Sequence, residues 1–424
     1  MARQMKDSGI EWIGEIPETW EMIPLKYLAS YNDETLGETT DDDYEFDYIE
    51  IGSVEYGKGI TGTEHMKFKN APSRARRIVR ENDIIVSTVR TYLKAVAKVT
   101  LDGQVASTGF VVIRPKNVNA SFLQYGILAH SFISMVEAFS VGISYPAINA
   151  SQVVGFKIPS PSMREQQKIA DYLDQQCAYI DAVIEKTKAS IEEYKKLKQA
   201  VITEAVTKGV RGERPMKDSG SVWFGEIPVD WEMNRLKYVF HIQKDIAGEE
   251  GHTVLSITQK GIKPKDLSKN EGQLAENYSN YQLVHVGDFA MNHMDLLTGW
   301  VDISKYEGVT SPDYRVFVLN DKKNDSHYYL YMMQMCYSNK IFYGLGQGVS
   351  GLGRWRLQAD KFLNFCIAVP PVHEQHEIAE YLDAKCSEID GLIENKEKML
   401  SELELYKKSL IYEYVTGKKE VPQS

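Results

Sequence analysis

The chain carries one arrangement of residues twice. Residues 5–27 read MKDSGIEWIGEIPETWEMIPLKY, and residues 216–238 read MKDSGSVWFGEIPVDWEMNRLKY, 211 positions later. A second block, EQQKIADYLDQQCAYIDAVIE at 165–185, returns 209 positions later as EQHEIAEYLDAKCSEIDGLIE at 374–394. Two matched blocks at nearly the same offset indicate a duplicated unit, and such a repeat limits the possible folds more than any local signal does.

The segments between the repeated blocks, roughly 28–158 and 239–368, share almost no sequence. A duplicated framework with unlike inserts predicts that the framework has the same function in both copies. The two inserts would then carry out two different versions of one function. A chain of 424 residues is also too long for one ordinary core. We therefore expect four parts, which are domains at 1–158 and 211–368 and helical segments at 159–210 and 369–424.

The second repeated block has the spacing of a coiled-coil seam, with steps that alternate between four and three residues. In the first copy the seam positions are Leu173, Cys177, Ile180, Ile184, Thr187, Ile191, Tyr194, Lys198, Val201 and Ala205. In the second copy they are Leu382, Cys386, Ile389, Ile393, Lys396, Leu400, Leu403, Lys407, Leu410 and Tyr414. Prolines precede both runs and glycines follow them, which predicts helices over 165–207 and 374–416. We expect the two helices to pack antiparallel, because each seam needs an apolar partner.

Two lysines interrupt the seam at equivalent positions, Lys198 and Lys407. A charge at such a position is costly unless it finds water or a partner. One interpretation is that the aliphatic stems follow the seam while the ammonium groups reach solvent. The other is that the lysines control helix register or contact a group outside the pair.

The inserts combine strand and helix patterns, so the predicted fold class is α/β. We expect two α/β domains separated by a long antiparallel two-helix coiled coil, with an internal pseudo-twofold repeat. Runs rich in β-branched and aromatic residues predict strands at 83–90, 110–114, 287–291 and 314–319. Apolar patterns predict helices at 122–139 and 326–337.

Charge gives a mixed signal about nucleic acid. The chain holds 49 Lys and Arg against 59 Asp and Glu, a net charge of −10. A phosphate backbone responds to the charge within about one Debye length, roughly 10 Å, so local patches matter more than the total. Residues 33–50 contain many acids and no Lys or Arg, whereas residues 67–98 are mainly basic. The negative total therefore does not exclude DNA binding.

Basic residues in both inserts are candidates for DNA contact. The cluster Arg74, Arg76, Arg77 and Arg80 is either a solvated face or a set of phosphate contacts. A glycine-rich segment at 344–353 leads into Arg354-Trp355-Arg356, which suits either a phosphate or base contact or a tight turn with Trp355 in the core. The remaining candidates are Arg90, Lys94, Lys260 and Lys263.

No catalytic motif is evident. The chain has no GxxxxGK[ST] phosphate loop, and the glycines at 344–353 follow a helix, which does not suit a dinucleotide motif. His373 and His376 are three positions apart, not the four of a zinc-binding HExxH helix. Asp313 and Asp321 loosely resemble nuclease carboxylates, but the first half has no counterpart. We expect neither a catalytic site nor a bound metal.

The composition also bears on the compartment. The four cysteines include no CxxC pair, which fits a reducing cytoplasm and excludes a cysteine zinc cluster. No apolar run approaches the roughly 18 to 20 residues that span a membrane, and the first residues lack an apolar signal core. We expect a cytoplasmic protein without a membrane partner.

The repeated blocks resemble one family closely, the specificity subunits of type I restriction-modification systems. The resemblance rests on DSGxxWxGEIPxxWE, present twice, and on PPVHEQHEIAEYLD at 370–383 with its variant PSPSMREQQKIADYLD at 159–174. The segments SPDYRV at 311–316 and GRWR at 353–356 are also similar to this family's recognition domains. The likeness covers essentially the whole chain, including the alternation of repeated framework and variable insert.

The resemblance implies a DNA-reading subunit without catalysis of its own. Each insert would be a target-recognition domain for one half of a bipartite, asymmetric DNA site, and the paired helices would fix the gap between the halves. Two modification subunits, which bind S-adenosylmethionine and methylate adenine, would dock on the helices. Restriction subunits, which use ATP and Mg²⁺, would join them, so no cofactor is expected on this chain. The alternative is a free-standing DNA-binding regulator.

Overall fold

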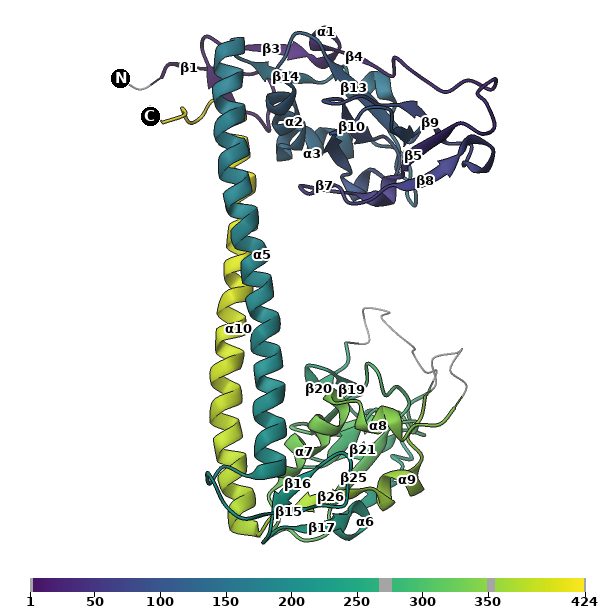
Figure 1. Cartoon of the computed structure of the whole chain (residues 1–424), viewed down its shortest axis with the longest axis vertical. Coiled ribbons are helices and arrows are strands. Elements are labelled where there is room, and N and C mark those ends of the chain that lie inside the picture. The colour runs from purple at the N-terminus through teal and green to yellow at the C-terminus, as the bar shows by residue number, and fades with distance from the viewer. Residues whose placement is uncertain (1–2, 267–276, 349–354, 423–424) are drawn as a thin grey trace. The chain divides into compact units, whose positions relative to one another are not determined.

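The computed structural model describes residues 3–266, 277–348 and 355–422 (Figure 1). The chain forms two compact units. Unit 1 consists of Met1–Lys188 and Lys398–Ser424, and unit 2 of Ala189–Glu397. Each unit contains one insert together with a part of both long helices, so each has a hydrophobic core of its own.

Unit 1 contains, among its described residues, two four-stranded sheets. The first has the order β11-β10-β13-β4 with antiparallel neighbours; its strands are β4 (Ala29–Tyr31), β10 (Ile84–Ser87), β11 (Val96–Lys98) and β13 (Phe110–Pro115). The second has the order β8-β5-β12-β9; its strands are β5 (Glu45–Ile49), β8 (Glu64–Lys67), β9 (Ala75–Ile78) and β12 (Val105–Ser107). In this second sheet β12 runs parallel to β5 and the other neighbours are antiparallel.

Short elements complete unit 1. The paired strands are β1 (Met5–Asp7) with β2 (Glu15–Pro17), β3 (Glu21–Pro24) with β14 (Lys157–Ser160), and β6 (Val54–Glu55) with β7 (Gly59–Ile60). The helices of the insert and its flanks are α1 (Leu25–Leu28), α2 (Ala120–Leu128), α3 (His130–Ala138) and α4 (Ala150–Val153). The strands expected at 83–90 and 110–114 are confirmed as β10 and β13.

The single helix expected over 122–139 is wrong, because α2 and α3 are separate. Ala129 lies between them with an extended backbone, ψ 138°. The carbonyl of Leu128 accepts a hydrogen bond of 2.7 Å from the hydroxyl of Tyr56. The hydroxyl of a residue distant in the sequence thus donates to a carbonyl at the break. The helical spacing of apolar residues cannot predict such a contact.

Unit 2 repeats the first sheet of unit 1 with unlike residues. Its order is β23-β22-β25-β18, with β18 (Phe240–Gln243), β22 (Phe289–Met291), β23 (Val301–Ile303) and β25 (Arg315–Leu319). Asp83 and Asp288 are equivalent residues of the two units, since each carboxylate accepts a hydrogen bond from the backbone N–H three residues earlier. The ladders then agree: Ile84 lies opposite Ile113 on β13, and Phe289 opposite Phe317 on β25.

The remaining elements of unit 2 are short. The paired strands are β15 (Met216–Asp218) with β16 (Glu226–Pro228), β17 (Glu232–Arg235) with β26 (Cys366–Val369), β19 (Leu255–Thr258) with β20 (Gly261–Pro264), and β21 (Gln282–Val284) with β24 (Gly308–Thr310). The helices are α6 (Leu236–Val239), α7 (Ser326–Ser338), α8 (Ile341–Gly344) and α9 (Ala359–Asn364). The strands expected at 287–291 and 314–319 and the helix expected at 326–337 are confirmed as β22, β25 and α7.

The two long helices are α5 (Met163–Lys208) and α10 (Val372–Val415), within two residues of the expected bounds. Gly209 and Gly417 follow them with φ of 77° and 71°, the left-handed conformation that ends a helix and that glycine adopts without strain. Of the expected packing positions, those that are buried are Leu173, Ile180, Ile184, Ile191, Leu382 and Ile389. Those that are half-buried are Ile393, Leu400 and Leu403.

Within unit 1 the beginning of α5 packs antiparallel on the end of α10. The rings of Tyr172 and Tyr414 have centres 4.7 Å apart. Further along α5, Asp181 contacts Lys407, which lies earlier in α10, with 2.6 Å between Oδ1 and Nζ. Residue numbers therefore rise along α5 in the direction in which they fall along α10, so the two helices are antiparallel here.

Within unit 2 the end of α5 meets the beginning of α10 in the same sense. The ammonium group of Lys396 lies 5.6 Å from the ring centre of Tyr194. Further along α5, the Nζ of Lys198 lies 2.7 Å from an Asp390 oxygen on α10. Both seam lysines thus pair with an aspartate of the opposite helix, and the two aspartates are 209 positions apart, as are the two lysines.

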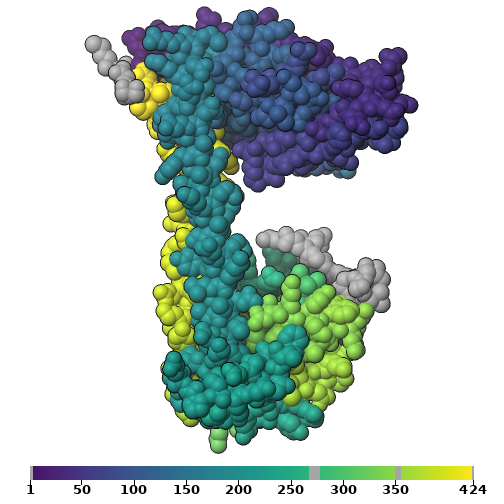
Figure 2. Space-filling model, in the orientation of Figure 1, coloured from purple at the N-terminus to yellow at the C-terminus, as the bar shows by residue number. Residues whose placement is uncertain are grey.

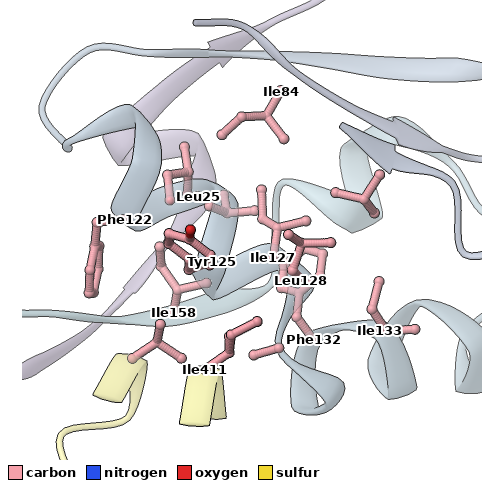
Figure 3. Packing of buried hydrophobic residues seen from close by; sticks show 14 of the residues in the cluster. Leu25, Ile84, Phe122, Tyr125, Ile127, Leu128, Phe132, Ile133, Ile158 and Ile411 are labelled. Carbon is pink, nitrogen blue, oxygen red and sulfur yellow. The ribbon is translucent and has the colours of Figure 1, made fainter. Parts of the chain in front are cut away.

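The main core of unit 1 joins the insert to the long helices. Figure 3 shows Phe122 and Phe132 of the insert helices gathered with Leu25, Ile158 and, from α10, Ile411. All of these side chains are buried. Burial of apolar surface contributes about 25 cal/mol per Å², so this shared core holds the insert against the helix pair.

A matching contact ties the first repeated block to the start of a long helix in each unit. In unit 1 the indole N–H of Trp20 donates to Glu165 (3.1 Å), and Arg3 pairs with the same carboxylate (2.6 Å). In unit 2 the corresponding residues are Trp231, Glu374 and Arg214, with distances of 3.0 and 2.5 Å. Each guanidinium also lies above the indole, 5.1 and 5.3 Å from its centre. These two contacts are termed the Trp–Glu–Arg clasps.

The two ends of the chain meet in unit 1. Arg3 also lies 3.9 Å from Glu420, and the hydroxyl of Tyr412 donates to the carbonyl of Ile13 (2.9 Å). In Figure 2 the yellow end of the chain accordingly lies against the purple beginning. The Trp–Glu–Arg clasp of unit 1 therefore lies beside residues from the last part of the sequence.

Candidate nucleic-acid interface

The acidic and basic runs of the first insert neutralise each other in space. Lys69 lies 2.9 Å and Lys67 3.2 Å from Asp43, and Arg80 lies 2.8 Å from Glu34. The ammonium groups of Lys69 and Lys67 lower the pKa of Asp43, and the guanidinium groups of Arg80 and then Arg114 lower that of Glu34. The separation of charge along the sequence is therefore not a separation on the surface.

The four arginines around β9 do not form a single cluster. Arg76 and Arg77 are neighbours on this strand, so their side chains leave opposite faces. The guanidinium of Arg76 lies 4.7 Å from the ring centre of Phe68, while half-buried Arg77 donates to the hydroxyl of Thr35 (3.4 Å) and has its pKa lowered by burial. Arg74 is exposed, whereas Arg80 is already paired with a carboxylate. Of the four, Arg74 and Arg76 are the better placed for a phosphate.

Arg90 and Lys94 lie in a loop that contacts a second loop, residues 140–147. The backbone N–H of Ile148 donates to the carbonyl of Thr88 (2.9 Å), and the hydroxyl of Thr91 donates to that of Ser140 (2.8 Å). Arg90 lies 5.4 Å from the ring centre of Tyr145, and Lys94 pairs with Glu137 (3.1 Å). The two loops are thus one structural feature, although they are far apart in the sequence.

This pair of loops exposes apolar and aromatic side chains, which are Tyr92, Leu93, Phe139, Val141, Ile143 and Tyr145. Ile143 is fully exposed and Val141 is 79% exposed. Contiguous exposed apolar groups of this kind commonly mark an interaction surface. A cation stacked on an aromatic ring among them suits contact with nucleic acid.

Unit 2 places the segment around Trp355 at the equivalent position. The N–H of Leu357 donates to the carbonyl of His293 (3.0 Å), as the N–H of Ile148 does to Thr88. Gln347 and Arg356 exchange backbone hydrogen bonds of 2.8 and 3.0 Å, as Val141 and Ala147 exchange two such bonds in unit 1. Of the predicted Arg354-Trp355-Arg356 segment, Arg354 lies outside the described residues.

The sequence allows two places for Trp355, in a segment that contacts DNA or in the core. In the structure its side chain is half-buried. Its indole N–H donates to the carbonyl of Tyr343 (2.7 Å), and the two rings have centres 5.7 Å apart. A Cβ on Gly346 would lie 2.3 Å from the indole nitrogen, so this position requires glycine. Arg356 is half-buried, with its backbone paired to Gln347.

Lys260 and Lys263 belong to the hairpin of β19 and β20. Both are exposed, Lys260 in the turn and Lys263 on β20. Lys260 lines a groove of about 660 Å³ together with Lys195, Lys198 and Lys340. The structure therefore brings Lys260 to the helix lysines of unit 2.

The sequence did not point to the loop at 140–147. Its residues, SVGISYPA, include neither a basic residue nor a glycine run. The repeat itself was the available signal, because the pair Val141 and Ala147 and the pair Gln347 and Arg356 occupy the same place in the two copies. Gly142 marks the turn, with a φ of 120° that an L side chain rarely adopts.

The structure also describes the histidines and aspartates considered as metal ligands and the helices considered as membrane spans. Over residues 3–266, 277–348 and 355–422, no group of three or more His, Cys, Asp and Glu side chains could hold a metal ion. His376 pairs with Asp325 (2.5 Å), and Asp321 accepts a hydrogen bond from the N–H of Lys323 (2.9 Å) in a turn. No helix in that part of the chain has the length and apolar character needed to cross a membrane.

The sequence matches a known family twice. The profile of the type I restriction modification DNA specificity domain matches residues 17–193 and 228–405, which together make up most of the chain. The chain belongs to the type I restriction-modification specificity family. The two matches coincide with the two copies of the repeat, and the resemblance seen in the sequence is confirmed. Members of this family are the non-catalytic DNA-recognition components of their systems, so the chain is not an enzyme.

Curated relatives agree along the whole length. The type I restriction enzyme MjaVIII specificity subunit of Methanocaldococcus jannaschii is 27% identical over 425 residues, covering 95% of this chain and 93% of the relative. The putative type I restriction enzyme MjaX specificity subunit of the same organism is 25% identical, covering 96% and 95%.

Solved structures share the fold. A chain from a study of complex assembly and conformational transition of the type I R-M system gives a TM-score of 0.74 at 20% identity, covering 95% of this chain and 99% of that one. The HsdS subunit from Thermoanaerobacter tengcongensis gives 0.52 at 20% identity, covering 95% and 98%.

Proposed function

We propose that each unit of this specificity subunit reads one half of a bipartite, asymmetric DNA site. The observation that carries the proposal is the contrast within the repeat. One four-stranded sheet has the same order in both inserts, but the loop at 140–147 and the chain between Gln347 and Arg356 differ in length and sequence. A shared sheet with unlike connecting segments suits two readers of unlike sequences, since scaffolds position loops and loops carry the binding residues.

The recognition domains in this proposal are residues 1–158 and 211–368. Contacts to phosphates and base edges would come from the basic side chains of each insert. Of the candidates that the sequence offered, those without a carboxylate partner among the described residues are Arg74, Arg76, Arg77, Arg90, Lys260, Lys263 and Arg356. Arg80 and Lys94 contribute less, because Glu34 and Glu137 already neutralise them.

The helical segments, residues 159–210 and 369–424, would form an antiparallel coiled coil with pseudo-twofold symmetry. This coil fixes the gap between the half-sites and binds two modification subunits. The support is the pairing of equivalent residues in each unit, Asp181 with Lys407 and Lys198 with Asp390. Rigid linkage of two weak readers raises the effective concentration of the second binding event.

Chemistry belongs to the partners in this proposal. The modification subunits bind S-adenosylmethionine, the restriction subunits use ATP and Mg²⁺, and the assembly works on double-stranded DNA in the cytoplasm. Members of the specificity family generally bind no cofactor themselves.

The test is reconstitution. The chain is purified with its modification subunit, the complex is weighed, and methylated adenines are mapped by sequencing in cells that carry both. We expect two modification subunits per chain and methylation at a two-part site with unlike halves. An undivided site would refute the proposal, and tight sequence-specific binding by the chain alone would indicate a free-standing regulator.

A further inference from the structure

Unit 2 contains a cavity of about 340 Å³ beside the sheet of its insert. The polar side chains that line it are Lys244, Gln282, His293, Tyr314, Arg315 and Gln358. The segment Ser311–Arg315 forms part of its wall, and Gln282 holds that segment by donating to the carbonyls of Ser311 (2.9 Å) and Tyr314 (2.6 Å). The proposed contacts of the recognition loops do not use this cavity.

Arg315 is buried at its base, with 5% of its surface exposed. One Nη donates to the carbonyl of Leu357 (2.8 Å), and the guanidinium lies 4.8 Å from the ring centre of Phe362. Among the described residues no carboxylate pairs with it. Burial lowers its pKa to about 10, so the group still carries its charge at neutral pH. A buried cation without a counter-ion is costly, and an anion supplied from outside would offset that cost.

Other cations surround the same cavity. Lys244 lines it, and within the described part of the chain this side chain has no ion pair. Burial lowers the pKa of His293 to about 3, and Arg315, Arg356 and Lys244 add to this effect, so His293 is neutral. The three cations therefore act in the same direction as burial, so the cavity beside His293 is a cationic environment.

The neighbouring acids do not cancel this charge. Asp295 accepts hydrogen bonds from the N–H groups of Leu297 and Thr298, both at 3.0 Å. Asp245 accepts from the side-chain amide of Gln243 (2.7 Å), and Asp313 is exposed. None of the three lines the cavity.

The first unit has none of these cations at the equivalent positions. The registers of the two sheets place Asp33 where unit 2 has Lys244, and Val111 where it has Arg315. The carbonyl of Thr88 accepts the bond that the carbonyl of His293 accepts in unit 2. The cationic cavity is thus a property of the second insert and not a requirement of the shared scaffold.

We infer that the cavity between Lys244 and Arg315 binds a phosphate group. The guanidinium is fixed by the carbonyl of Leu357, by the Sδ of Met291 (4.0 Å from the other Nη) and by the ring of Phe362, which leaves further N–H donors for an anion. The ammonium group of Lys244 at the exposed side would complete a two-point contact. The phosphate comes either from the DNA backbone, in which case the inference rests on the proposed function, or from a free phosphate compound.

The first test uses inorganic phosphate and the full chain, so it is independent of DNA. Binding is measured by calorimetric titration at constant ionic strength, with sulfate-free chloride buffer as reference. Lys244→Asp gives unit 2 the residue of unit 1 at an exposed position, and Lys305→Asp makes the same charge change on an exposed lysine that does not line the cavity. We expect saturable binding that Lys244→Asp weakens at least tenfold and Lys305→Asp leaves within twofold.

Arg315→Val, which copies the other unit at the buried position, should abolish phosphate binding while the circular-dichroism spectrum stays unchanged. The inference is overturned if phosphate binding does not saturate, or if Lys244→Asp and Lys305→Asp bind phosphate with equal affinity. Either result holds whether or not Arg315→Val folds.

The second test identifies the source of the phosphate. The affinity for cognate DNA, measured with the modification subunit present, is plotted against salt concentration on logarithmic axes. If the ligand is a backbone phosphate, Lys244→Asp lowers the slope by about 0.9 relative to Lys305→Asp, because one fewer contact releases counter-ions. Equal slopes together with lost phosphate binding would identify a free phosphate compound as the ligand.

Discussion

At the residue scale, two lysines occupy core positions of the long helices. Lys407 has 16% of its side chain exposed and Lys198 30%, and each meets an aspartate of the opposite helix. The heptad pattern predicts both positions but not the aspartates, since these lie outside the seam and their distance depends on the helix register. An ion pair between different residues of two helices favours one register over its neighbours, as seam polar groups do in other coiled coils.

Charge exchange at one pair tests this role. Asp181→Lys places two cations together and should lower the free energy of unfolding by about 1 kcal/mol, whereas the double variant Asp181→Lys with Lys407→Asp should recover most of the loss. The free energies come from urea unfolding followed by helical circular dichroism. Glu193→Lys, an exposed change on the same helix, serves as control. No recovery in the double variant would show that the pair does not select the register.

His293 should make the stability of the protein depend on pH. Its pKa is about 3 in the folded chain and about 6.5 when unfolded, so the unfolded chain binds the extra proton between these values. Stability is therefore complete above about pH 6.5 and falls as the pH drops toward 3, with about 2 kcal/mol lost between pH 7 and pH 5. Urea unfolding at pH 7 and pH 5 measures this loss of stability in the unmodified chain and in His293→Asn. Between these two pH values the variant should lose about 2 kcal/mol less than the unmodified chain. Equal losses would contradict the burial of a neutral imidazole.

At the element scale, the clasps differ in burial although their residues are the same. The side chain of Glu374 is 0% exposed and that of Glu165 is 32% exposed. Glu374→Ala removes a fully buried carboxylate from a guanidinium that is only 13% exposed and should cost about 3 kcal/mol, whereas Glu165→Ala should cost about 1 kcal/mol or less. Thermal unfolding of both variants provides a matched comparison. Equal losses would mean that burial does not decide the strength of the clasps.

The elements differ in how far the sequence determines them. Heptad spacing with proline and glycine at the ends predicts α5 and α10 to within two residues, because helix periodicity and capping are local. The break between α2 and α3 depends on the hydroxyl of Tyr56, and the loop at 140–147 depends on its contact with Thr88. Contacts between distant segments are invisible in a single sequence, and both features were missed for that reason.

The candidate site shows the same limit. The basic residues at 67–98 are evident in the sequence, but the acids that neutralise Lys67, Lys69 and Arg80 lie in the strand and loop before them. The cavity at Arg315 joins residues from β18, β21 and β25, which are far apart in the sequence, and its lack of a counterpart in unit 1 follows from the register of the sheets and not from any local motif.

At the scale of the whole molecule, the proposal makes the helices a spacer whose length sets the gap between half-sites. A heptad inserted after Ile191, with another after the equivalent Leu400, keeps the seam in phase and adds about 10 Å at 1.5 Å per residue. At about 3.4 Å per base pair, the gap should grow by about three base pairs while both half-sites stay the same. Mapping of methylated adenines reads this out directly. An unchanged gap with active methylation would show that the helices do not set the spacing.

The most direct measurement of the central claim, that the inserts are separate readers, is an exchange of one of them. Residues 28–158 are replaced by the corresponding insert of another specificity subunit, and methylated adenines are sequenced in cells that also carry the modification subunit. We expect one half-site to change while the other half-site and the gap remain as they were. A change in both half-sites, or in neither, would contradict it.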